Sequence, residues 1–361
     1  MGASAHLAGC FTSLKPMNSM KKTLLALAAL TAAAGATAQA SNVALFGVVD
    51  ASVGHISTQG KSVTGLASGG NSSSRLGFRG VEDLGGGLTA GFWLEGGVNV
   101  DDGTSAGFKF DRRSTLSLMG NFGELRLGRD KTPTYLNLET FHAFGDSGMG
   151  GINAHNLISG SAAGTSEGSA PKRFSNSIAY LLPKMGGFYG QVAHSFGEEA
   201  GDSSLKSATG LRLGYASGPL NLSGAYGITR GGTAAAGVDY KSMNLGASYQ
   251  IGDFTPMVLI ASERGAGRRV DVYSLGVKMK LGAGELRAAY TDYNDKKGAN
   301  DSQRFALGYG YQLSKRTEIY GAVARLNNDG SATRKLASSL SPTPGAGESM
   351  TGYEIGIRHN F

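Results

Sequence analysis

Apolar and polar residues alternate with a period of two along most of the chain after residue 40. In the segment NLGASYQI (244–251), leucine, alanine, tyrosine and isoleucine share one register, and asparagine, glycine, serine and glutamine share the other. The segments 43–53, 211–215 and 220–228 repeat this pattern. Successive side chains of a β-strand point to opposite faces, so the period predicts strands with one apolar and one polar face. Helical spacing is not sustained anywhere after residue 40, and we expect an all-β fold.

The breaks between the predicted strands alternate in length. Seven are tight, such as 84–87 and 281–284, and they alternate with eight longer polar stretches. The longer stretches lie near 58–72, 99–108, 131–171, 197–206, 231–238, 264–268, 296–302 and 328–349. An even number of antiparallel strands, with short turns at one rim and long loops at the other, is typical of outer-membrane barrels. The sequence therefore predicts a closed antiparallel transmembrane β-barrel of about sixteen strands in the cell outer membrane.

The final segment, TGYEIGIRHNF (351–361), also alternates and ends on an aromatic residue, Phe361. In a bilayer every backbone N–H and C=O needs an internal partner, and a closed barrel leaves no strand edge. We therefore expect the last strand to pair with the first, with Phe361 in the aromatic girdle at the membrane interface. A soluble β-sandwich or lectin-like protein of the periplasm is the alternative. The alternating loop lengths and the terminal aromatic fit that alternative poorly.

The start of the chain carries an export signal. Two lysines, a short apolar run and an A-x-A cleavage site follow one another in residues 20–40. This order predicts a secretory signal peptide. Residues 1–19 contain LAGC, which resembles a lipoprotein cleavage box, but no basic start or apolar core precedes it, and we interpret 1–19 as an upstream extension. The barrel is then expected over residues 41–361.

Composition narrows the function classes. The formal net charge is +7, and no basic tract suggests a nucleic-acid partner. The single cysteine, Cys10, precedes the expected barrel, so disulfides and thiolate chemistry are excluded from it. No P-loop or dinucleotide fingerprint is present, and the histidines have no motif-like context. We expect neither an enzyme nor a bound metal or cofactor.

If the apolar register faces lipid, the polar register lines the lumen. The inward-pointing basic residues then include Arg75, Arg79, Arg113 and Arg126, whereas Arg112 points outward near a rim. Further inward candidates are Arg212, Lys278, Arg287 and Arg358, with the acids Asp50, Glu95 and Glu354. Arginine stays charged in a lumen, and rows of arginine or lysine favour anions. The alternative is that these arginines merely pair with acids across the wall.

The stretch 131–171 differs from the other connections because it is long and contains apolar residues such as Tyr135, Phe141 and Phe144. Long connections tend to be functional or disordered, and these side chains need a place to be buried. The barrel interior is the nearest place where they can be buried. Folded inward, this loop would place Glu139 and Asp146 opposite the wall arginines, and opposed charges across a narrow aqueous gap select ions and orient dipolar solutes.

Several motifs together resemble the general diffusion porins of Gram-negative outer membranes, and most closely the anion-preferring trimeric type of beta-proteobacteria. The motifs that carry the resemblance are VALFGVVDASV, SSRLGFRGVEDLGGGL, RRSTLSL, GELRLGRDKTPTY, RFSNSIAY and IGIRHNF. The likeness covers essentially all of 41–361. It departs in the third loop, where HAFGDSG (142–148) stands in place of the Pro-Glu-Phe-Gly-Gly of many porins. The acidic partner in that loop is therefore open between Glu139 and Asp146.

The resemblance implies a sixteen-stranded barrel, a homotrimer, and a third loop folded into the pore. By motif match, Arg75, Arg113 and Arg173 look like the constriction arginines, and Arg173 rests mainly on the resemblance. The implied function is passive diffusion of small hydrophilic solutes and ions with a weak to moderate anion preference. The implied partners are outer-membrane lipid, lipopolysaccharide and small anionic or hydrophilic solutes.

Two other functions are compatible with a barrel. A substrate-specific porin would need aromatic residues stacked as a sugar slide, and the single tryptophan, Trp93, argues against it. A non-conducting adhesin or structural anchor is less compatible, because no passenger or peptidoglycan-binding domain is recognisable beside the barrel.

Overall fold

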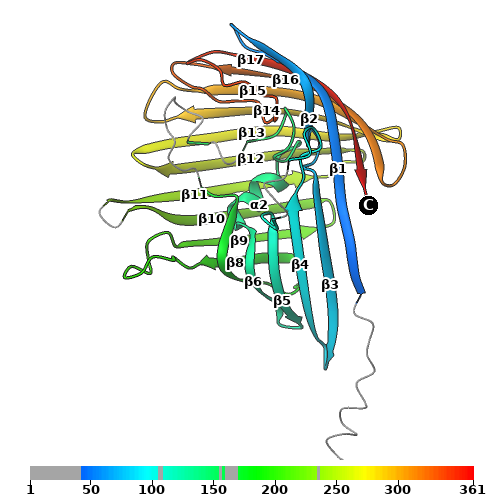
Figure 1. Cartoon of the computed structure of the whole chain (residues 1–361), viewed down its shortest axis with the longest axis vertical. Helices are drawn as coiled ribbons and strands as arrows, with labels where there is room; N and C mark the ends of the chain where they lie inside the picture. The colour runs from blue at the N-terminus through cyan, green and yellow to red at the C-terminus, as the bar shows by residue number, and fades with distance from the viewer. Residues whose placement is uncertain (1–41, 105–108, 154–156, 159–169, 234–235) are drawn as a thin grey trace, which may run out of the picture. The chain divides into compact units, whose positions relative to one another are not determined.

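The computed structural model describes residues 42–104, 109–153, 157–158, 170–233 and 236–361. The predicted signal peptide at 20–40 and the predicted extension at 1–19 lie outside the described residues. Apart from one short helix, the regular secondary structure of the described residues is all β-strand (Figure 1). Among these residues, no helix is both long and apolar enough to cross a bilayer.

Seventeen strands form one antiparallel sheet. From β3 to β17 each strand pairs with the next in sequence, while β1 pairs with β2, β3 and β17. The strands are β1 (Asn42–Ser57), β2 (Ser62–Ser68), β3 (Arg75–Gly85), β4 (Leu88–Gly97), β5 (Arg113–Gly120), β6 (Gly123–Lys131), β7 (Arg173–Leu181), β8 (Phe188–Ser195), β9 (Ala208–Ser217), β10 (Leu220–Thr233), β11 (Ala236–Tyr249), β12 (Phe254–Gly265), β13 (Arg268–Leu281), β14 (Gly284–Asp295), β15 (Ser302–Gln312), β16 (Thr317–Asn328) and β17 (Met350–Asn360). One short helix, α2 (Pro133–Thr140), interrupts the series between β6 and β7.

The sheet closes on itself at β1. One edge of β1 pairs with β17, from Val48 opposite Asn360 to Ser57 opposite Thr351. The other edge pairs first with β3 and then with β2. The predicted closed barrel is therefore confirmed, with sixteen strands in the ring and β2 as an additional strand inside the stretch predicted as the first long loop.

The two registers of the strands face different surroundings. Large apolar side chains are exposed on one face of the sheet, for example Leu245 at 60% and Ile355 at 69% exposure. Their alternate neighbours, such as Asn244 and Glu354, are buried on the other face. An apolar outer band with a polar interior is the arrangement that a bilayer requires of a barrel.

Two of the predicted long loops, 231–238 and 264–268, are wrong. β10 and β11 stay paired up to Thr233 opposite Ala236, and β12 and β13 up to Gly265 opposite Arg268. Their small and polar composition indicates loops, but the hairpins continue as paired strands beyond the apolar band. Since a strand needs about 9–11 residues to cross a bilayer, the 14-residue strands β10, β11 and β13 extend past the hydrocarbon.

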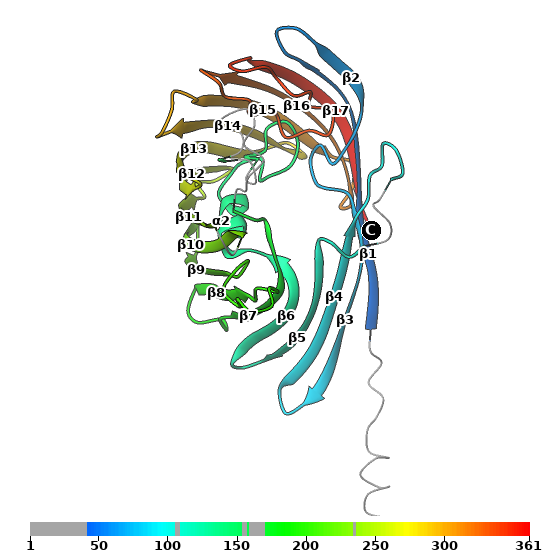
Figure 2. The same cartoon turned by 60° about the vertical axis from the view of Figure 1, so that its left-hand side comes forward.

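The third loop connects β6 to β7 and runs inside the ring, as predicted. Its helix α2 packs against β9, β10 and β11 on the inner side of the wall (Figure 2). This 8-residue helix is too short to give a sustained helical period in the sequence, and the expected all-β fold is confirmed. A local signal was present, because the Thr132 hydroxyl accepts a hydrogen bond from Tyr135 N (3.2 Å) as the N-cap and Pro133 follows as the first helical residue.

Candidate functional site

The third loop is fixed to one side of the inner wall by hydrogen bonds from α2. The Asn137 amide donates to Ser223 O (3.1 Å) and to Asn244 Oδ1 (2.7 Å), while its own oxygen accepts from the Ser223 hydroxyl (2.6 Å). The Arg212 guanidinium reaches Asn137 Oδ1 (3.0 Å) and the Thr140 hydroxyl (3.1 Å) from β9. Arg212 therefore serves to hold the loop, although its register predicts only that it faces the lumen.

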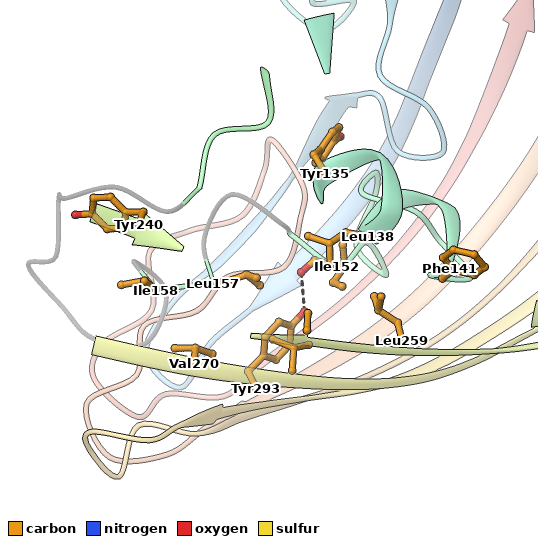
Figure 3. Packing of buried hydrophobic residues seen from close by; sticks show 12 residues of the cluster. Tyr135, Leu138, Phe141, Ile152, Leu157, Ile158, Tyr240, Leu259, Val270 and Tyr293 are labelled. Atoms are coloured by element: carbon orange, nitrogen blue, oxygen red, sulfur yellow. Dashed lines mark hydrogen bonds between the residues drawn. The ribbon is translucent and has the colours of Figure 1, made fainter. Parts of the chain in front are cut away.

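Apolar contacts complete this anchorage. Phe141 is 1% exposed and lies directly on Gly246 of β11, where a Cβ atom would meet the ring at 2.2 Å. Only a glycine leaves the wall flat enough for this ring. Further along the loop, the Tyr293 hydroxyl donates to Ile152 O at 2.7 Å (Figure 3). The buried residues around this bond include Leu138, Ile152, Leu157, Leu259 and Val270, which form a dry cluster between loop and wall.

His142 sits in the middle of the anchored loop and is fully buried. Its Nε2 lies 3.2 Å from the Thr291 hydroxyl, and its Nδ1 accepts from Phe144 N at 3.3 Å. Burial, followed by the nearby charge of Arg304, lowers the pKa of His142 to about 3. The ring is therefore neutral at physiological pH and acts as a packed, hydrogen-bonded spacer.

On the opposite side, the loop faces strands β3 to β7 across a cavity of about 350 Å³. Six cationic side chains line it against three carboxylates. The cationic residues are Arg75, Arg112, Arg113, Arg126, Lys131 and Arg173, and the acidic residues are Glu95, Asp130 and Glu139. We call this space the basic cavity. The surplus of guanidinium groups makes it favourable for anions.

Glu95 organises one part of the basic cavity. Its Oε1 lies 2.7 Å from Arg112 Nε and 3.8 Å from Arg75 Nε. The Trp93 indole donates to its other oxygen at 3.2 Å. Arg75 also donates to the Ser73 carbonyl (2.9 Å), so its guanidinium is held against the residues just before β3.

Arg112 was expected to point outward, and this expectation is wrong. It lines the basic cavity and forms the closest contact to Glu95. The physical reason is that Arg112 precedes β5, which begins at Arg113, so the alternation of the strand does not determine its direction. Its carbonyl accepts a hydrogen bond from Arg173 Nε (2.7 Å), which brings the end of the third loop to the same place.

Trp93 separates two arginines on the wall. The guanidinium carbon of Arg113 lies 4.6 Å from the Trp93 ring centroid, and that of Arg79 lies 5.1 Å from it. Arg79 also lies 5.2 Å from the Phe46 ring. Such stacking holds a guanidinium in place without neutralising it. Arg79 is thus next to the basic cavity but does not line it.

Asp130 is a second acidic centre. Its Oδ2 lies 2.6 Å from Arg126 Nη1 and 3.6 Å from Arg113 Nε. Arg126 also contacts Glu124 at 2.8 Å. Sequence reasoning missed Asp130, although continuing the alternation of β6 from Arg126 places it on the same face.

The two acidic candidates of the third loop occupy different positions. Glu139 lines the basic cavity and pairs with Lys131 at 2.6 Å. The Asp146 side chain is buried within the loop, where it forms an ion pair with Lys172 and accepts a hydrogen bond from the Tyr135 hydroxyl at 3.1 Å. Burial, with the charge of Asp146 next, raises the pKa of that tyrosine above its usual range. Of the two acids, Glu139 is therefore the one that faces the wall arginines.

The described residues contain no group of three or more histidine, cysteine, aspartate or glutamate side chains arranged to hold a metal ion. Fixed guanidinium and carboxylate groups line the basic cavity. Such a site binds and orients charged solutes through hydrogen bonds and Coulomb attraction.

The family model described as Gram-negative porin matches residues 26–331 of this chain. The chain belongs to the Gram-negative porin family. Its resemblance to these porins, the barrel with an inward third loop, and the outer-membrane location are thereby confirmed. Members of this family are channels rather than enzymes, and this porin is a diffusion channel.

Relatives of this porin cover nearly its whole length. Outer membrane porin protein 32 of Delftia acidovorans is 40% identical over 95% of this chain and 100% of the relative. An outer membrane porin protein of Bordetella pertussis is 28% identical, again over 95% of this chain and 100% of the relative. Both span the full barrel, so the likeness is not confined to one hairpin.

Solved porin and outer-membrane protein structures have the same barrel fold as this chain. The anion-selective porin from Comamonas acidovorans superposes with a TM-score of 0.78 and 37% identity, over 89% of this chain and 100% of that one. The trimer form of OmpT from Vibrio cholerae gives a TM-score of 0.63 at 15% identity, over 90% and 100% of the two chains. The second likeness shows the barrel fold alone.

Proposed function

We propose that this porin is a passive channel for small hydrophilic solutes and ions with a weak to moderate preference for anions. The observation that carries the proposal is the basic cavity, with its six cations against three carboxylates between the wall and the third loop. A solved relative at 37% identity is named an anion-selective porin. Paired arginines still contribute a positive potential here, because the acids are outnumbered.

In this proposal Arg75, Arg113 and Arg173 act as constriction residues, and Glu139 is the acid of the third loop that faces them. Arg126 is held between Glu124 and Asp130, so its charge is largely compensated and it supports the wall. Arg79 lies beside the basic cavity and extends the positive surface along the lumen. Asp146 fixes the base of the loop through Lys172.

The test is the reversal potential of the reconstituted channel in a salt gradient across a planar bilayer. Wild-type protein is expected to prefer anions, and the variant Arg75→Gln/Arg113→Gln/Arg173→Gln is expected to lose that preference. Three exposed cations that do not line the basic cavity provide a matched control, Lys184→Gln/Arg230→Gln/Arg325→Gln. Cation preference in the wild type, or an equal loss in both variants, contradicts the assignment to the basic cavity.

We also infer that the porin assembles as a homotrimer and contacts outer-membrane lipid and lipopolysaccharide. The trimer form of a structural relative supports the first inference only at the level of fold. Gly47 on β1 is covered by the Phe361 ring and does not offer a free surface for packing between barrels. Mass measurement of the detergent-purified protein with and without heating tests the trimer.

A further inference from the structure

Three cations lie side by side on the outer wall, at the end of the barrel opposite the tight turn at 281–284. Lys241 of β11 is the direct cross-strand partner of Arg264 of β12, and Arg264 is the partner of Arg269 of β13. The three line a small cleft together with Tyr226, Met243 and Ser262. We call this group the outer basic triad. The three strands are adjacent in the sheet (Figure 1).

The register places the outer basic triad on the lipid-facing side. Met243 and Ile260 occupy the same registers as Lys241 and Arg264, and both are about half exposed, at 49%. On β13, Tyr273 has the register of Arg269 and is 45% exposed. The alternate residues of these strands, such as Glu263, are buried on the inner face of the sheet instead. The triad is therefore separate from the basic cavity.

The arrangement is unfavourable for the isolated chain. Like charges directly opposite each other on neighbouring strands destabilise a sheet. Asp271 compensates Arg269, with Oδ1 and Oδ2 at 2.9 and 3.0 Å from its guanidinium nitrogens. Within the part of the chain that the structure describes, neither Lys241 nor Arg264 forms an ion pair. An anion between these two side chains would relieve the repulsion.

The position of the outer basic triad along the strands indicates which kind of anion would bind between Lys241 and Arg264. Arg269 lies four positions beyond Tyr273, about 13 Å along the strand. Tyr226 and Tyr273 mark the level at which aromatic residues meet the membrane interface. Below them the wall is apolar, with Leu245 and Leu275 exposed at 60% and 62%. A ligand held here has its anionic group at the triad and its apolar part along these side chains.

We propose that the outer basic triad binds the phosphate group of a phosphorylated, acylated lipid of the outer leaflet. The inference deepens the proposed contact with outer-membrane lipid and rests on it. Phosphate suits Arg264 and Arg269 because a guanidinium offers paired N–H donors to its oxygens, and Lys241 adds a point charge. The acyl chains pack against Met243 and Ile260, which turns the lipid into a structural partner of β11, β12 and β13.

The experiment uses the full-length folded porin in detergent and purified lipid A as the probe, with bound lipid counted by native mass spectrometry. The variant Lys241→Gln/Arg264→Gln/Arg269→Gln is expected to lower the affinity for lipid A about tenfold or more. The control Lys184→Gln/Lys315→Gln/Arg316→Gln removes the same charge from exposed residues at the opposite rim and is expected to change it less than about twofold.

Two further probes identify the occupant. Dephosphorylated lipid A is expected to bind the wild type as weakly as lipid A binds the triad variant. Inorganic phosphate at millimolar concentration is expected to leave lipid A binding unchanged. Equal binding of the two lipids, displacement of lipid A by inorganic phosphate, or equal affinity of the triad variant and the wild type overturns the proposal.

The folding and the channel activity of each variant are measured separately from its lipid binding. The triad variant is expected to keep the conductance and ion preference of the wild type, because its residues do not line the basic cavity. If the triple variant does not fold, Arg264→Gln alone takes its place, and Arg264→Lys is expected to restore binding in part. A wild-type channel without anion preference would contradict the channel proposal without bearing on lipid binding.

Discussion

The main chains of Gly47 and Phe361 exchange two hydrogen bonds, each 3.1 Å between nitrogen and oxygen. The Phe361 ring lies on the face of Gly47, so that a Cβ at this glycine would meet Cζ of the ring at 2.3 Å. The last residue of the chain is thus locked onto the first strand by backbone and side chain together. A closed barrel leaves no edge for pairing, and this contact completes the closure.

Enlarging Gly47 is expected to weaken the closure. Gly47→Val would push the Phe361 ring away and lower the stability of the barrel by about 1–3 kcal/mol, as overpacking does elsewhere. The measurement is the temperature at which the folded band on a gel converts to the unfolded one. Gly60→Val is the control, because no atom lies within 4 Å of its added Cβ. An unchanged transition in Gly47→Val would show that Phe361 does not contribute to closure.

Enlarging Gly246 is expected to free the third loop. Gly246→Ala would place a Cβ at 2.2 Å from the Phe141 ring and force the loop away from β11. Such overpacking is expected to lower the free energy of unfolding by about 1–3 kcal/mol. The single-channel conductance should then rise or become noisy, because the loop no longer narrows the lumen. Gly321→Ala is the matched control, since its Cβ would make only an ordinary contact at 3.5 Å. Identical conductance in both variants speaks against loop anchorage by Phe141.

Removing the Trp93 ring is expected to reduce anion preference without changing any charge. Trp93→Leu deletes the surface on which Arg113 and Arg79 stack, an interaction of about 0.5–2 kcal/mol. Trp93→Phe keeps a stacking face but loses the 3.2 Å hydrogen bond to Glu95, so it should retain most of the preference. Reversal potentials of the three proteins provide the comparison. Equal values would mean that Trp93 does not hold the arginines in place.

Acid is expected to loosen the third loop through His142. The folded pKa of His142 is about 3, below its ordinary value of 6.5, so the folded state binds fewer protons than the unfolded state between these pH values. Stability therefore falls as pH drops below 6.5, by up to about 1.4 kcal/mol per pH unit, until pH reaches about 3. His142→Gln removes this titration and keeps a donor for Thr291.

The measurement for His142 is the thermal midpoint at pH 7 and at pH 4.5. Between pH 7 and pH 4.5 the thermal midpoint of the wild type is expected to fall further than that of His142→Gln, because only the wild type has a buried imidazole to protonate. An equal loss in the two proteins would assign the acid sensitivity to other groups.

The alternation of residues by itself determined the barrel and the direction of most side chains. A strand has two faces, and a bilayer accepts only apolar residues on one of them, so the inward direction of Arg75, Arg113 and Arg126 follows from their neighbours in sequence. The apolar content of the third loop likewise indicated that it folds inward. These are local properties, and a single sequence contains them.

Tertiary structure alone decided which charges meet. Glu95 pairs with Arg112, which lies 17 residues away and outside any strand, and Asn137 is held by Ser223 and Asn244 on strands reached only after the loop. Asp146 forms an ion pair with Lys172 and not with the arginines of the wall. Such pairings depend on how distant segments approach one another once the ring has closed. Period and composition describe each strand separately, and they contain no information about that approach.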